Sequence, residues 1–279
     1  MKNLAPLTWR DCVQPDWQVS PRVRALVTTR DGGVSEGPYG RWQDGAAQPG
    51  GMNLGLHTGD DPAHVAENRA RLLALAGQPR AAWLEQVHGA RIVRADEVIA
   101  ADSDSTAPVR ADASVTDRAN AVCVVMVADC LPVLLCDAQG RAVGAAHAGW
   151  RGLAAGIVED TAAQVAALAG GATDSLHAFL GPAIGPDAFE VGADVRDAFL
   201  DTAPQSEHDE TRRAFAAIEG APGKYLADLH ALARLRLARA GVSRVSGGGA
   251  CTVTEPSRFY SYRRDRVTGR MAAAIWLAD

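Results

Sequence analysis

The sequence predicts an α/β fold in which residues 1–279 form a single domain, with a mixed central β-sheet flanked by helices. Two continuous valine-rich apolar runs, at 121–128 and 131–136, are typical of strands that are buried on both faces. Helical patterns and short apolar runs then alternate towards the end of the chain. A length of 279 residues with 47% hydrophobic residues is sufficient for one large core.

The clearest element of the first half is a helix predicted over 62–76. Asp61 can cap its N-terminus, Pro62 suits its first turn, and Gly77 marks its end. The other expectations for this half are a strand at 23–30, a turn at 31–33 that opens a glycine-rich segment to Gly51, strands at 82–87 and 90–95, and a polar, disordered stretch at 101–110. We interpret the glycine-rich segment as a mobile lid.

The second half predicts further strands and two long helices. They follow the two valine-rich runs in this order: a turn at 138–140, a strand at 142–146, a helix at 153–169, a strand at 176–180, a helix at 225–240, and strands at 244–246 and 271–277. Helices that alternate with strands in this way are expected to cover the faces of the sheet.

Composition narrows the classes of partner and the cellular location. A net charge of −5 and a pI near 5.8 give no basic surface for nucleic acid or for an anionic membrane. The longest apolar run falls far short of the roughly 20 residues that span a bilayer, and no secretory signal pattern opens the chain. A cytoplasmic protein is expected. Five widely spaced cysteines favour reduced thiols or a metal ligand over a disulfide framework.

Three metal-capable side chains occur where strand patterns break, namely His88, Cys130 and His147. Two imidazoles and a thiolate match the ligands of a catalytic zinc, which keeps a fourth position open. Their separations match no short zinc-finger spacing, so the fold would have to assemble the site. The ordinary alternative is that Cys130 packs as a small apolar residue and that both histidines are satisfied by hydrogen bonds.

Neighbouring residues supply further candidates. Asp129 precedes Cys130 and can orient groups or handle protons, although a carboxylate there can also cap a turn. Arg151, at a helix start, can bind an anion or form a surface salt bridge. Cys123 and Cys136 lie inside the apolar runs and are expected to be unreactive core residues.

Ordered motifs over most of the chain resemble the YfiH-type laccase-domain family. These motifs are N-L-G-L-H-T-G-D-D from Asn53, E-N-R from Glu67, Q-V-H-G from Gln86, A-D-C-L-P-V-L-L from Ala128, A-H-A-G-W-R-G from Ala146, G-P-A-I-G from Gly181 and F-Y-S-Y-R-R-D from Phe259. The resemblance implies a zinc site on His88, Cys130 and His147. Members of the family were once called polyphenol oxidases and are now associated with purine nucleoside phosphorylase activity.

The activities implied by the resemblance are phosphorolysis of adenosine, inosine and methylthioadenosine, and deamination of adenosine. A purine nucleoside and phosphate are then the small-molecule partners. Arg151 is the first candidate for binding phosphate, and Asp129 for an orienting or proton-handling role. Stacking of the base is expected from aromatic side chains, the candidates being Trp150, Phe259, Tyr260 and Tyr262.

Three competing functions stay open. A copper-dependent polyphenol oxidase could use the same ligands with Met126. Multicopper chemistry needs a further copper cluster held by many histidines, and the seven histidines here include no His-x-His pair, so zinc is favoured over copper. A cysteine-type amidohydrolase that edits peptidoglycan precursors, after which bacterial relatives are also named, would use Cys130 as nucleophile and His147 as base. An interaction protein with a structural metal is the third.

Overall fold

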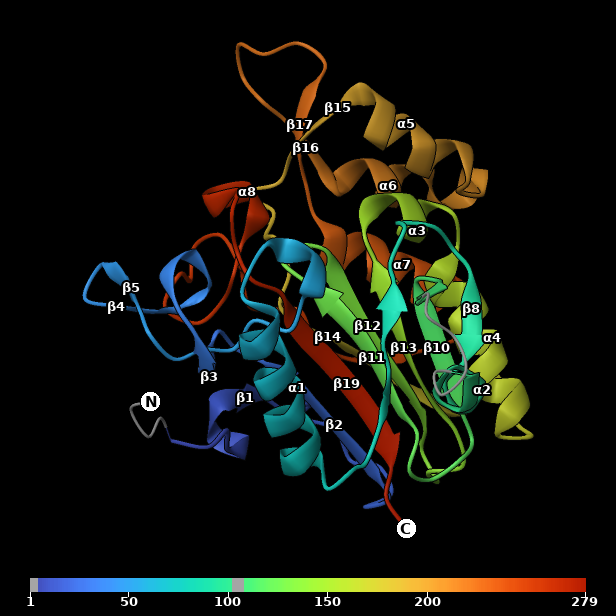
Figure 1. The fold of residues 1–279 in the computed structure, drawn as a ribbon. Coiled ribbons are helices and arrows are strands. Elements are labelled where there is room, and N and C mark those ends of the chain that lie inside the picture. Colours follow the sequence, from blue (N-terminus) through green and yellow to red (C-terminus); the bar gives the residue numbers. More distant parts are fainter. Residues whose placement is uncertain (1–4, 102–107) are drawn as a thin grey trace.

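The computed structural model describes residues 5–101 and 108–279, and it shows an α/β architecture built on two mixed β-sheets (Figure 1). The five-stranded sheet has the order β1 (Cys12–Val13), β2 (Val23–Thr28), β19 (Met271–Leu277), β11 (Val122–Val127), β6 (Ala81–Ala82). The six-stranded sheet has the order β18 (Arg244–Gly247), β14 (Leu176–Leu180), β12 (Leu131–Asp137), β13 (Val143–Ala148), β10 (Ala113–Thr116), β8 (Ile92–Arg94). Parallel pairs occur at the edges, β6 with β11, β8 with β10 and β14 with β18, and the other pairs are antiparallel.

The two sheets pack face to face and share one apolar core. Successive residues of a strand point to opposite faces, so each valine-rich run serves two cores. In β11, Val125 faces the core between the sheets, whereas Val124 faces the outer side. In β12, Leu134 faces the core between the sheets and Leu135 the outer side. Both faces are therefore buried, which is why the runs contain no polar interruption.

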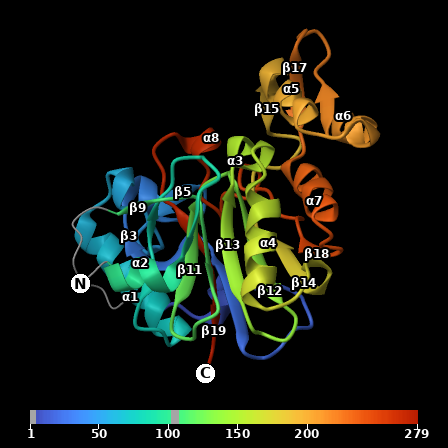
Figure 2. The ribbon, with the colours of Figure 1, turned by 90° about the vertical axis from the view of Figure 1, so that its right-hand side faces the viewer.

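Helices cover the two outer faces (Figure 2). α1 (Pro62–Ala76) lies against the five-stranded sheet, where Leu72 belongs to the same cluster as Trp276. α4 (Ile157–Leu168) and α7 (Leu229–Arg239) lie against the six-stranded sheet on the opposite side. α2 (Ala95–Ala101) packs beside β6, β8 and β10. In the described part of the chain, no helix combines the length and the apolar character needed to cross a membrane.

A small lobe projects beyond the sheets, at the top of Figure 1. Its antiparallel sheet has the order β15 (Glu190–Gly192), β17 (Lys224–Ala227), β16 (Phe215–Ala217), and its helices are α5 (Ala193–Asp201), η5 (Gln205–Glu207) and α6 (His208–Arg213). Phe199 and Phe215 pack with ring centroids 5.9 Å apart and form its interior with Tyr225. The strand β15 follows Phe189, so the lobe is attached beside the cavity described below.

Short elements complete the fold. They are η1 (Trp9–Asp11), β3 (Asp31–Ser35), η2 (Gly37–Tyr39), β4 (Arg41–Gln43), β5 (Ala46–Gln48), η3 (Leu56–Thr58), β7 (Leu84–Glu85), β9 (Val109–Arg110), α3 (Trp150–Ala154), η4 (Thr173–Ser175) and α8 (Tyr262–Asp265). The glycine-rich segment 31–51 thus contains β3 and the β4–β5 hairpin. Its interpretation as a mobile lid stays a prediction, as does the treatment of 1–279 as one domain.

The predicted α/β class and the mixed sheet flanked by helices are confirmed, with the strands divided between two sheets. The helix at 62–76 and the strands at 176–180 and 271–277 have the predicted bounds. The predicted helix 153–169 is divided into α3 and α4, because Gly156 adopts φ 92° between them. The predicted helix 225–240 was wrong at its start, where β17 ends and Asp228 caps α7 by accepting the Ala231 N–H. Most of the disordered stretch predicted at 101–110 lies outside the described residues.

A candidate metal centre in an aromatic and cationic cavity

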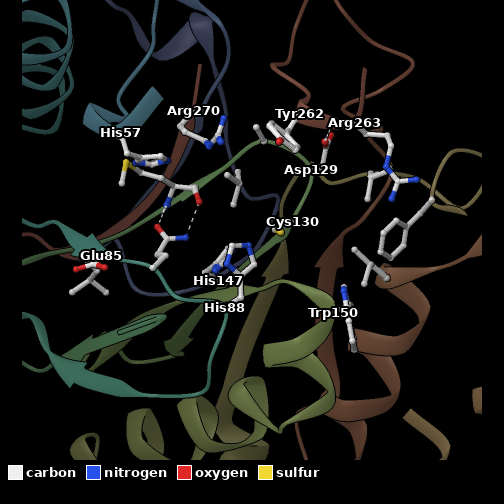
Figure 3. A pocket seen from close by; sticks show the side chains of 18 residues that line it. His57, Glu85, His88, Asp129, Cys130, His147, Trp150, Tyr262, Arg263 and Arg270 are labelled. Carbon is white, nitrogen blue, oxygen red and sulfur yellow. Dashed lines mark hydrogen bonds between the residues drawn. The ribbon is translucent and has the colours of Figure 1, made fainter. Parts of the chain in front are cut away.

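The three predicted ligands come together at one end of the sheets, where Figure 3 shows them in a cavity. The potential ligand atoms of His88, Cys130 and His147 all lie within 4.8 Å of one another. Ligand atoms of a tetrahedral zinc lie about 3.5 Å apart, given bonds of about 2.0–2.3 Å, so a small convergence would suffice. One thiolate and two imidazoles form a donor set that suits zinc. The group can therefore hold a metal ion.

Strand pairing explains why residues distant in sequence meet here. Antiparallel pairing of β12 with β13 places Leu131 opposite Ala148 and Pro132 opposite His147, so Cys130 lies beside the end of β13. Asp129, at φ 103°, lies in the turn between β11 and β12, and His88, at φ 60°, follows β7. Left-handed backbone is costly for both residue types. One strained turn thus carries the ligand His88, and the other, at Asp129, directly precedes the ligand Cys130.

Two glycines of the A-H-A-G-W-R-G motif make room for this group. A Cβ on Gly149 would lie 3.1 Å from Cys130 Sγ and 3.4 Å from His88 Cδ2. A Cβ on Gly152 would lie 2.6 Å from the backbone oxygen of Gly89, closer than non-bonded atoms can approach. The glycines therefore allow the start of α3 to approach the two segments that carry His88 and Cys130.

Asp112 is a functional candidate that the sequence analysis missed. Its buried carboxylate lies 2.9 Å from His147 Nδ1 and accepts the backbone N–H of His88 at 2.9 Å. Asp112 is the second residue after the stretch 101–110 that was predicted to be disordered. The signal that could have found it is the pattern Ala111-Asp112-Ala113, a lone carboxylate flanked by small residues before an alternating strand.

Charge coupling sets the protonation of the group. Burial raises the pKa of the Cys130 thiol, but the imidazoles of His147 and His88 outweigh burial and bring that pKa below the ordinary thiol value. Burial lowers the pKa of His147, whereas Cys130 and Asp112 raise it, with a net increase. Burial raises the pKa of Asp112, but hydrogen bonds from His147 and from Gly89 lower it overall. A thiolate and a carboxylate thus flank His147.

The cavity in front of these ligands has a volume of about 560 Å³. Aromatic side chains of Trp150, Phe189 and Tyr262 line it. One wall is fixed by Gln86, whose side chain accepts the Met126 N–H at 2.7 Å and donates to the backbone oxygen of Met126 at 2.8 Å. Cavities that bind small molecules commonly measure about 300–1,000 Å³, so a nucleoside-sized ligand fits this one.

Two arginines bring positive charge to the cavity. Arg270 donates through Nη1 to the backbone oxygens of Thr268 at 3.2 Å and Gly269 at 3.1 Å. Arg263 donates through Nη1 to the backbone oxygen of Glu190 at 3.2 Å. Within residues 5–101 and 108–279, neither guanidinium pairs with a carboxylate. Both therefore keep donors for an anionic ligand.

The remaining predicted site residues occupy different places. Asp129 lines the cavity, and its carboxylate accepts the Thr252 hydroxyl and the Arg263 backbone N–H, each at 2.6 Å. Arg151 is exposed, lies 4.4 Å from the centroid of the Trp150 ring, and is absent from the cavity lining. Its assignment as the phosphate-binding residue stays a prediction.

Several other candidate aromatic and cysteine side chains lie in the apolar core or outside the cavity lining. Phe259 and Tyr260 are fully buried in a core cluster and do not line the cavity, whereas the two other aromatic candidates do. Cys123 and Cys136 belong to the core between the sheets, and burial raises the pKa of both thiols, as predicted for unreactive cysteines. Cys251 lies outside the cavity lining, and its sulfur accepts the Gly185 N–H at 3.2 Å.

The fold and the site define an α/β protein of two stacked mixed sheets with a candidate metal centre at the inner end of a nucleoside-sized cavity. Residues 24–278 match the family model described as multi-copper polyphenol oxidoreductase laccase. The chain belongs to this family, which comprises the YfiH-type laccase-domain proteins.

Named relatives and solved structures agree with that assignment. The chain is 48% identical over 265 residues to a purine nucleoside phosphorylase of Pseudomonas aeruginosa, covering 95% of this chain and 98% of the relative. It is 46% identical over 266 residues to the purine nucleoside phosphorylase YfiH of Escherichia coli, with the same coverage. A Neisseria meningitidis protein described as family-model DUF152 superposes with a TM-score of 0.84 at 46% identity, covering 96% of this chain and 100% of that structure. YlmD from Geobacillus stearothermophilus superposes with a TM-score of 0.84 at 33% identity, covering 99% of each chain.

Proposed function

We propose that this chain is a zinc-dependent purine nucleoside phosphorylase that acts on adenosine, inosine and methylthioadenosine and also deaminates adenosine. The observation that carries the proposal is that one cavity combines the group of His88, Cys130 and His147 with two arginines that lack carboxylate partners in the described chain. The relatives named purine nucleoside phosphorylase support the same class of reaction. A cytoplasmic location stays a prediction.

Phosphorolysis requires an anion site beside the ribose. An oxygen of phosphate forms a bond to C1′, the bond from C1′ to the base nitrogen breaks, and its electron pair leaves with the base. Arg270 and Arg263 are proposed to bind the phosphate, because guanidinium groups donate paired hydrogen bonds to its oxygens. Trp150 and Tyr262 are proposed to stack on the base.

Asp129 is proposed as a positioning residue for this arrangement. Both of its carboxylate oxygens already accept hydrogen bonds at 2.6 Å, one from Thr252 and one from the backbone of Arg263. Asp129 therefore connects the turn that carries Cys130 to the start of α8, from which Arg263 enters the cavity. This connection fixes the metal ligand and the proposed phosphate ligand relative to each other.

The same cavity suits deamination of adenosine. A bound divalent ion would act as a Lewis acid and would lower the pKa of a bound water to about 7. The hydroxide formed in this way is the nucleophile that deamination needs. His88, Cys130 and His147 would hold the ion, and the aromatic walls would exclude bulk water. Phosphate plays no part in this second reaction, so the two activities can be separated experimentally.

Incubation with adenosine in the presence and absence of phosphate tests the proposal. With phosphate, chromatography is expected to show adenine and ribose 1-phosphate, because C1′ then has its nucleophile. Without phosphate, inosine is expected as the main product, since deamination consumes only water. The zinc-loaded chain is compared with the same preparation after chelation. If neither product forms in the zinc-loaded sample, the proposed function is wrong.

The cysteine-type amidohydrolase is a second candidate, favoured by the lowered pKa of Cys130. Its nucleophile and the metal compete for the same sulfur. We expect iodoacetamide to label Cys130 rapidly after chelation and slowly when zinc is bound. Because the thiolate is the reactive form, labelling of the metal-free chain should already be fast at neutral pH and slow on acidification. Mass spectrometry of the labelled peptides gives the rates.

Cys123 and Cys136 serve as internal controls in that experiment, because burial raises the pKa of both thiols and the folded chain should leave them unlabelled. Labelling of Cys130 at one rate with and without zinc would favour the amidohydrolase. The copper-dependent polyphenol oxidase is proposed only as the weakest alternative. Within the described residues, a single group of histidine, cysteine or carboxylate ligands is able to hold a metal, whereas multicopper oxidation needs a further cluster.

A further inference from the structure

The carboxylate of Asp112 is shared between the two segments that carry the candidate histidine ligands. It is fully buried just before β10. Its Oδ1 lies 2.9 Å from His147 Nδ1 and accepts the His88 N–H at 2.9 Å. Its Oδ2 accepts the N–H groups of Val87 at 3.2 Å and Gly89 at 2.8 Å. Each oxygen thus receives two donors.

On the side of His147, the carboxylate determines which ring nitrogen is available. A neutral imidazole has one N–H donor and one acceptor nitrogen. Since Asp112 accepts from Nδ1, the lone pair of Nε2 is left for the ligand group. The backbone N–H of His147 also donates to the backbone oxygen of Asp112 at 2.7 Å, which fixes the position of β13 relative to Asp112.

On the side of His88, the carboxylate holds a backbone conformation that is costly by itself. His88 adopts φ 60°, in the left-handed region, and such a residue costs of order 1–3 kcal/mol unless its surroundings impose it. The N–H groups of three consecutive residues, 87–89, converge on Asp112 and form an anion-binding turn. Asp112 in turn donates its own N–H to the Arg91 oxygen at 3.0 Å.

We infer that Asp112 is a positioning residue of the metal centre that acts on both histidine ligands, by fixing the Nδ1–H tautomer of His147 and the left-handed turn at His88. Carboxylates that accept the second N–H of a ligating histidine typically contribute about 10–100-fold to metal affinity. Asp112 combines that role with support of a second ligand. The inference rests on the metal site of the proposed function.

Asp112→Asn tests the inference. An amide has a single acceptor oxygen. An NH₂ group in the place of Oδ2 would face the N–H groups of Val87 and Gly89, and one in the place of Oδ1 would face both the ring of His147 and the N–H of His88. Either orientation removes acceptors from the segments that carry the histidine ligands. We expect the affinity for zinc, measured by competition with a chromophoric chelator, to fall by about 10–100-fold. The visible absorption of the chain loaded with Co²⁺ should also change, because it reports the ligand geometry.

Asp137→Asn is the matched control. Asp137 is equally buried, at the end of β12 remote from Cys130, and its carboxylate accepts from Arg141 and from the backbone N–H of Gln139. Thermal unfolding should register a loss of stability in both variants, whereas zinc affinity should fall only in Asp112→Asn. Equal zinc affinity in the wild type and a folded Asp112→Asn chain would overturn the role of Asp112 and leave the metal site intact. A wild-type chain that binds no zinc would overturn both.

A measurement on the wild-type chain keeps the inference testable if Asp112→Asn fails to fold. Nitrogen-15 NMR of the metal-free chain distinguishes the two tautomers of a neutral histidine and also detects the doubly protonated ring. Cys130 and Asp112 raise the pKa of His147, so the spectrum is recorded at an alkaline pH at which the ring is neutral. We expect its single proton on Nδ1, because Asp112 holds it there. A proton on Nε2 alone would contradict the inference.

Discussion

Cys130→Ala is expected to abolish zinc binding and to lower the rate of adenosine phosphorolysis by about a thousandfold or more, while the chain stays folded. Loss of the thiolate leaves two imidazoles, one of them exposed, which cannot hold a divalent ion tightly. A metal ion contributes several kcal/mol of charge stabilisation, and about 4 kcal/mol corresponds to a thousandfold in rate. Steady-state kinetics and metal analysis of the purified variant check both expectations.

The folded state of this variant distinguishes a catalytic from a structural metal. Cys130 is half-buried at the cavity, and the cores between and outside the sheets are built from apolar side chains that do not include it. Thermal unfolding of Cys130→Ala should therefore resemble that of the metal-free wild type. Cys251→Ser is the matched control, because this cysteine is also half-buried but lies outside the cavity lining, and it should retain zinc. Cooperative unfolding of Cys130→Ala at room temperature would favour the interaction protein with a structural metal.

The sequence predicted the two valine-rich strands well, because strands that are buried on both faces consist of apolar residues. It predicted the shorter strands less well, since the predicted strand at 82–87 is divided between β6 and β7 and the turn predicted at 31–33 lies in β3. In β11 and β12, every residue is buried, and the continuous apolar runs report this. They do not report what covers each face. Val124 faces helix α1 and its neighbours, whereas Val125 faces the second sheet, yet the two residues are identical. Division into two sheets depends on long-range pairing, which no local pattern encodes.

The sequence identified the site residues whose types are rare at strand ends. It did not identify the residues whose role depends on tertiary contacts. A cysteine and two histidines at strand ends are unusual enough to be noticed, and the structure brings them together. Asp112 was missed because its importance comes from the turn at His88 and the ring of His147, neither of which adjoins it in sequence. Arg270 was missed for the same reason, since it directly precedes an ordinary core strand, β19, and only the fold directs it to the cavity.

Arg270→Met is expected to lower kcat/KM for phosphate by about 10–100-fold and to change deamination of adenosine by much less. Methionine keeps the aliphatic stem that packs near Tyr262 but removes the guanidinium, which lies 5.7 Å from the centroid of that ring. Hydrogen bonds to charged groups are each worth about 1.5–3 kcal/mol, which corresponds to that range of rates. Deamination needs no phosphate, so its rate serves as an internal control for the integrity of the metal site and of base binding.

Arg151→Met is the comparison variant, because Arg151 and Arg270 are alternative candidates for binding the phosphate. Arg151 is exposed on α3, stacked on Trp150 and outside the cavity lining. Arg270 is partly buried within the cavity, and burial lowers its pKa even though the nearby charges of Cys130 and Asp129 act in the opposite direction. A buried cation in that state gains more from an incoming anion than an exposed one does. The loss in kcat/KM for phosphate should therefore be larger for Arg270→Met than for Arg151→Met. The opposite order would assign the phosphate to Arg151 and place the anion at the start of α3.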